Sequence, residues 1–78
     1  MSKLTKIFSS VLNISESEVI GSLSPQTNTA WDSLNAIILL TEIEKAFDLK
    51  FTYEEAMAIK NFDEVLKLIS SKGKDPYE

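Results

Sequence analysis

Residues 32–47 read DSLNAIILLTEIEKAF and contain the longest uninterrupted apolar run of the chain. At 3.6 residues per turn, one side of this segment carries a complete core stripe, made of Ala36, Leu39, Leu40, Ile43 and Phe47. A second stripe consists of Leu34, Ile37, Ile38 and Thr41. The spacing therefore predicts a helix over 33–47 with more apolar surface than one packing face requires.

The second stripe has two interpretations. The helix could lie at the centre of the fold and be buried all round, or the stripe could stay exposed and bind a partner protein. We favour the exposed stripe, because a chain of 78 residues has too few helices to surround one of them.

The remaining segments also predict helices. Residues 2–14 have helical apolar spacing behind Ser2, a typical N-cap residue. Three capping boxes pair a Ser, Thr or Asn with a Glu three residues later: Ser15 and Glu18, Thr52 and Glu55, and Asn61 and Glu64. We expect an all-α fold, a small four-helix bundle over 1–72. It has three longer helices, a short third helix at 52–59, a long loop over 21–30, and a polar tail at 73–78.

Composition excludes several functions. The chain has no Cys and no His, so it offers no thiol nucleophile, no Ser-His-Asp triad and no zinc site built on these residues. A net charge of −4 disfavours nucleic acid as a partner and favours a protein with a basic patch. The sequence shows neither a signal peptide nor a membrane-spanning run. We expect a cytoplasmic monomer that is not an enzyme and does not insert into membranes.

Asp32 and Ser33 stand where helix N-caps stand, and only one of them can cap. Both could have a purely structural role. If Asp32 is the cap, however, Ser33 falls at the first helical position with a free hydroxyl. A helix N-terminus presents unpaired N–H groups and the positive end of the dipole, which favours a phosphate ester on Ser33.

Asp32-Ser33-Leu34 begins an apolar helix that ends in Glu-x-x-Phe and is followed by a short acidic helix at 52–59. Over residues 2–72 this pattern resembles the acyl carrier proteins. The resemblance implies that a separate phosphopantetheinyl transferase converts Ser33 to a 4′-phosphopantetheine ester. The thiol of that cofactor would carry acyl groups as thioesters, and the chain would need no Cys of its own.

The resemblance also implies roles for other positions. Asp32 would cap the helix and contribute to recognition. The partner enzymes would be an acyl ligase, a synthase or an acyltransferase. Together with the exposed stripe, the expected partner surface is Leu34, Ile37, Ile38, Thr41, Glu44, Glu54 and Glu55. The core or acyl cavity would be lined by Ala36, Leu39, Ile43, Phe47, Phe51 and Ile59.

The chain departs from the carriers of general fatty-acid synthesis, which have acids at the positions of Asn35, Ile38 and Lys45. Trp31 replaces a small residue, and we expect it to form an aromatic lid on the loop. The WDSL form resembles stand-alone carriers of specialised pathways, such as surface-polysaccharide, polyketide or other secondary-metabolite assembly.

Two other functions remain open. The chain could carry amino or hydroxy acids, or it could be an unmodified helical adaptor. We also expect a small or polar cargo, because Phe51, Met57 and Phe62 should fill much of the cavity.

Overall fold

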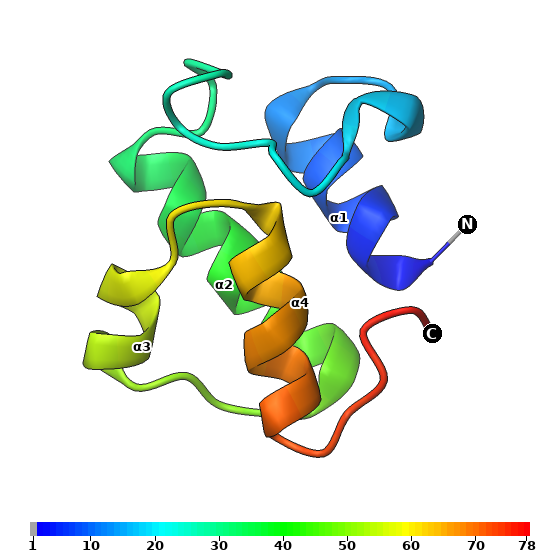
Figure 1. Ribbon diagram of the computed structural model, residues 1–78, viewed down its shortest axis with the longest axis vertical. Coiled ribbons are helices and arrows are strands. Elements are labelled where there is room, and N and C mark those ends of the chain that lie inside the picture. The colour runs from blue at the N-terminus through cyan, green and yellow to red at the C-terminus, as the bar shows by residue number, and fades with distance from the viewer. Residues whose placement is uncertain (1) are drawn as a thin grey trace.

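A computed structural model describes residues 2–78. Its helical elements are α1 (Lys3–Leu12), the 3₁₀ turn η1 (Glu16–Glu18), α2 (Ser33–Phe47), α3 (Tyr53–Ala58) and α4 (Phe62–Ser71). Residues 2–78 contain no strand. Figure 1 shows α2 behind α4, with α1 and α3 on opposite sides. The predicted all-α architecture, including the short third helix and the long loop before the second, is confirmed.

Local side-chain caps set the first turns of α1 and α3. The Ser2 hydroxyl accepts the Thr5 N–H at 3.2 Å, which satisfies one free donor of α1. At α3 the predicted capping box is reciprocal. Thr52 Oγ1 accepts the Glu55 N–H at 3.1 Å, and Glu55 Oε1 accepts the Thr52 N–H at 2.8 Å.

The start of α4 differs from the predicted capping box. Asn61 Oδ1 accepts the Glu64 N–H at 2.9 Å, as expected for the N-cap. The Glu64 carboxylate, however, accepts the N–H of Lys60 at 2.7 Å, one residue before the N-cap. At the other end, Gly73 follows the C-cap with φ +81°, a left-handed conformation that suits glycine and ends the helix.

The loop over 21–30 is anchored on α4. The N–H groups of Phe62 and Asp63 donate to the carbonyls of Leu23 and Gly21, at 2.9 and 3.1 Å. A Cβ at Gly21 would lie only 2.8 Å from Asp63 Oδ1, so glycine permits this close approach. Leu23 of this loop is buried. The loop thus supplies acceptors to a helix N-terminus that lacks intrahelical partners.

The core joins all the longer helices. Phe8 of α1 is fully buried and lies edge-on to two other rings, Trp31 at 5.2 Å and Phe62 at 4.9 Å between centroids. Trp31 is only 6% exposed. It therefore packs into the core against α1, whereas the sequence indicated a lid on the loop.

The last residues pack back onto the start of α1. The N–H of Lys3 donates to the Glu78 main-chain oxygen at 2.8 Å, and Lys3 Nζ lies 3.3 Å from Glu78 Oε1. Pro76 is buried. The start of α1 and the last residues of the chain accordingly lie side by side in Figure 1.

Candidate functional site

Asp32 caps α2 and leaves Ser33 free. The Asp32 carboxylate accepts the Asn35 N–H at 2.9 Å, and its carbonyl accepts the Ala36 N–H at 2.8 Å. Ser33 is the first helical residue and is exposed. Within residues 2–78 neither the Ser33 hydroxyl nor the N–H groups of Ser33 and Leu34 have hydrogen-bond partners. The site thus combines an exposed nucleophilic oxygen with free backbone donors.

Asn35 holds the approach to Ser33. Its side-chain amide donates to the Ala30 carbonyl at 2.7 Å, which closes the preceding loop onto the first turn of α2. Trp31, buried in the core, anchors the same segment from the other side. From the sequence, Asn35 was noted only because carriers of general fatty-acid synthesis have an acid at this position. A carboxylate has no proton to donate to a carbonyl, so an acid cannot make this bond.

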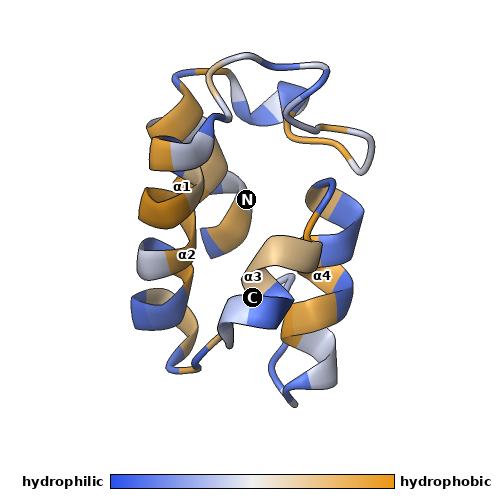
Figure 2. Ribbon diagram, turned by 90° about the vertical axis from the view of Figure 1, so that its left-hand side faces the viewer, coloured by the Kyte–Doolittle hydropathy of each residue, from blue (hydrophilic) through white to orange (hydrophobic). Residues whose placement is uncertain are grey.

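The second apolar stripe of α2 is exposed. Leu34 is 68%, Ile37 64% and Ile38 40% exposed, and Thr41 is also exposed with its hydroxyl bonded to the Ile37 carbonyl. The core stripe, by contrast, turns inward, and the structure does not bury α2 all round. Figure 2 shows α2 changing from largely orange in its N-terminal half to blue near its C-terminal end. The apolar surface therefore lies next to Ser33.

The three acids expected at the partner surface differ in whether their carboxylates already have partners within the protein. The Glu44 carboxylate accepts the Phe51 N–H at 2.9 Å and so holds the link between α2 and α3. Glu55 completes the cap of α3 and also lies 2.8 Å from Lys72 Nζ. Glu54 is exposed and makes no ion pair within residues 2–78. Of the three, Glu54 has the most accessible charge for a partner.

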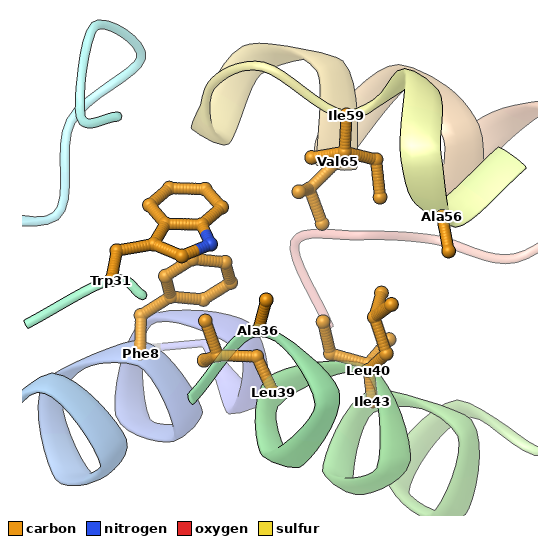
Figure 3. A pocket seen from close by; sticks show the side chains of 9 residues that line it. All are labelled: Phe8, Trp31, Ala36, Leu39, Leu40, Ile43, Ala56, Ile59 and Val65. Atoms are coloured by element: carbon orange, nitrogen blue, oxygen red, sulfur yellow. The ribbon is translucent and has the colours of Figure 1, made fainter. Parts of the chain in front are cut away.

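A cavity of about 40 Å³ lies between α2 and the α3–α4 side of the bundle. Its walls are Phe8, Trp31, Ala36, Leu39, Leu40, Ile43, Ala56, Ile59 and Val65. Figure 3 shows Phe8 and Trp31 at one end, with the α2 side chains facing Ile59 and Val65 across the gap. Four expected lining residues, Ala36, Leu39, Ile43 and Ile59, are in these walls.

The side chains expected to fill this cavity lie elsewhere. Met57 is 66% exposed, and Phe62 is buried beside Phe8. Phe51 is half-buried, with Lys72 Nζ 5.8 Å from its ring centroid. Phe47 was expected in the core or at the cavity, and it lies in the core. None of them lines the cavity. Its volume is limited instead by Phe8 and Trp31. From the sequence, cavity residues were expected mainly in and next to α2 and α3, and for that reason these two were not included.

Comparison with known proteins matches residues 2–69 to the family described as "Phosphopantetheine attachment site". The chain belongs to this family. The acyl carrier protein of Buchnera aphidicola subsp. Schizaphis graminum is similar, with 29% identity over 72 residues, covering 92% of this chain and 91% of that protein. The protein is accordingly a carrier of the acyl carrier type and not an enzyme, and its cofactor is 4′-phosphopantetheine.

The residues at the N-terminus of α2 fit this cofactor. A phosphate diester needs an exposed hydroxyl to bear it and gains from nearby N–H donors, and both are present at Ser33. In residues 2–78, no helix combines the length and hydropathy needed to cross a bilayer. The same residues contain no group of three or more Asp, Glu, His or Cys side chains that could bind a metal ion.

Proposed function

We propose that this protein carries acyl intermediates as thioesters on a phosphopantetheine arm attached to Ser33. The observation that supports Ser33 is its free hydroxyl in the first turn of α2, next to a cap supplied by Asp32. When bound, phosphopantetheine supplies a flexible arm that ends in a thiol. The chain presents this arm and binds the enzymes that load and use it.

The attachment step is a phosphoryl-group transfer. Ser33 Oγ forms a bond to the phosphorus that carries the pantetheine part of coenzyme A. The bond from that phosphorus to the bridging oxygen breaks, adenosine 3′,5′-bisphosphate leaves, and the serine proton passes to a base on the transferase. The N–H groups of Ser33 and Leu34 can donate to the phosphodiester that results, in the favourable field of the α2 dipole.

The partners that we propose are the transferase and an acyl ligase, synthase or acyltransferase of a specialised pathway. The support is the exposed surface next to Ser33, where Leu34 and Ile37 are apolar and no acid stands at Asn35 or Ile38. Exposed charge pairs weaken with salt, whereas apolar contacts do not. Recognition should therefore depend on apolar contacts more than on ion pairs. We propose that the carrier acts as a monomer in the cytoplasm.

The test is to incubate the protein with coenzyme A and a broad-specificity phosphopantetheinyl transferase and to measure its intact mass. We expect one added arm in the wild type and none in Ser33→Ala. The matched control is Ser10→Ala, because Ser10 of α1 is also exposed with a hydroxyl that has no partner within residues 2–78. Modification of Ser33→Ala, or none of the wild type, would contradict the proposal, and the second result would support an unmodified adaptor.

A further inference from the structure

The cavity has a single polar side-chain group, the indole N–H of Trp31. The other eight lining side chains are hydrocarbon and carry neither a charge nor a hydrogen-bonding atom. Trp31 is 6% exposed, and its N–H donates to no protein atom within residues 2–78. The indole N–H of a buried ring normally has a hydrogen-bond partner, so this free donor is open to an acceptor that the protein itself does not supply.

The indole nitrogen faces open space. Among residues 2–78 no side-chain nitrogen or oxygen that is sealed from solvent lacks a hydrogen-bond partner. The unpartnered Trp31 nitrogen is therefore not sealed. Figure 3 shows it on the side of the ring that faces Ala36 and Val65, toward the gap between α2 and the opposite wall.

The volume limits what can enter. A dry apolar cavity of about 150 Å³ holds one benzene molecule. The cavity of about 40 Å³ is roughly a quarter of that size, so by the same measure it takes on the order of two carbon atoms. A longer chain would have to displace Phe8 or Leu39, both buried in the close-packed core.

We propose that Trp31 determines cargo specificity. Its ring closes one end of the cavity, and its Nε1–H donates to an oxygen on a short, uncharged acyl group, such as a hydroxyacyl or oxoacyl group. The indole N–H can only donate a hydrogen bond, so it favours a cargo that carries an acceptor oxygen. An ammonium group would enter without an acidic partner and lose its hydration, which disfavours amino acids as cargo. This inference rests on the proposed function, because the cargo reaches the cavity on the arm of Ser33.

The experiment loads the protein through the transferase from butanoyl-, 3-hydroxybutanoyl- and octanoyl-coenzyme A. Because the chain has one Trp, its indole N–H gives one resolved NMR signal. We expect 3-hydroxybutanoyl, but not butanoyl, to move this signal downfield and to slow its hydrogen exchange roughly fivefold, as for one neutral hydrogen bond. Equal shifts and exchange rates for the two cargoes would overturn the inference and leave water as the partner of the indole.

Two further measurements test the hydrogen bond from Trp31 and the size limit of the cavity separately. In Trp31→Phe, the amide shifts of Ala36 and Ile59 should no longer distinguish butanoyl from 3-hydroxybutanoyl, since the donor is gone. In the wild type, shifts of Ile43 and Ile59 should not grow from butanoyl to octanoyl. Continued growth would overturn the size limit. A chain that gains no mass refutes the proposed function, whereas a loaded chain with an unresponsive indole refutes this inference alone.

Discussion

Glu55 and Lys72 join the short helix α3 to the C-cap of α4, with 2.8 Å between Glu55 Oε1 and Lys72 Nζ. The Lys72 ammonium and the Thr52 N–H hold the pKa of Glu55 below its ordinary value. Since the folded pKa is the lower one, the pair stabilises the fold above the unfolded carboxyl pKa, about 4.3. That contribution disappears as the pH falls through the folded pKa.

Glu55→Gln should therefore lower the urea midpoint at pH 7 more than at pH 3. Glutamine can still complete the capping box, so the change isolates the charge. The matched control is Glu54→Gln, an exposed neighbour without an ion pair in the described chain, and it should show no such pH dependence. An equal loss at both pH values would mean that the pair does not contribute through its charge.

Asp32→Ala should destabilise the protein by about 1 kcal/mol, the usual cost of losing an N-cap. Asp32→Asn should keep the cap, because Asn caps as well as Asp. We expect Asp32→Asn to retain the urea midpoint but to be modified by the transferase more slowly, since it lacks the charge that we propose the transferase recognises. Modification at the wild-type rate would leave Asp32 with a capping role only.

Asn35→Asp should destabilise the segment before Ser33. The loss of the bond to the Ala30 carbonyl leaves an acceptor without its donor, at a cost of roughly 1–3 kcal/mol. A carboxylate in the first turn returns roughly 0.3–1 kcal/mol through the helix dipole, so a net loss remains. Urea unfolding measures this loss of stability. Faster hydrogen exchange of the Trp31 main-chain N–H, which donates to the Asn28 carbonyl, would show that the loss arises in the segment before Ser33. Unchanged exchange would mean that the bond from Asn35 to the Ala30 carbonyl does not hold this segment.

Ile37→Glu should raise the KM of the transferase for this carrier with little effect on folding, because Ile37 is 64% exposed. Surface changes of this kind usually alter stability by less than about 0.5 kcal/mol. Ile20→Glu is the control, since Ile20 is 56% exposed but lies in the loop after η1. The wild-type rate should also vary little with NaCl. A steep salt dependence would point to ion pairs instead.

Phe8→Ala should cost roughly 3–5 kcal/mol, because Phe8 is fully buried and touches two other rings. Phe51→Ala should cost less, since Phe51 is half-buried and does not line the cavity. Chemical denaturation of the two variants checks the order. A larger loss for Phe51→Ala would place that ring in the core.

The sequence determined the features that depend on neighbours three or four residues apart. Apolar spacing and caps such as Ser2, Thr52 and Asn61 located the helices to within two residues or so. The same local pattern limited the N-cap of α2 to Asp32 or Ser33, because the N-cap bond spans only three residues, and the structure shows that Asp32 is the cap. Family membership shows that the cofactor is phosphopantetheine, and we propose Ser33 as its attachment point.

The tertiary structure alone decided which apolar side chains meet. The cavity walls come from positions as distant as Phe8 and Val65, and no periodicity relates such positions. Met57 was expected inside and is exposed, while Trp31 was expected on the loop and lies in the core. Helix packing fixes which side of each helix turns inward, and that choice depends on all the helices together. For this reason the free indole N–H became visible only in the folded chain.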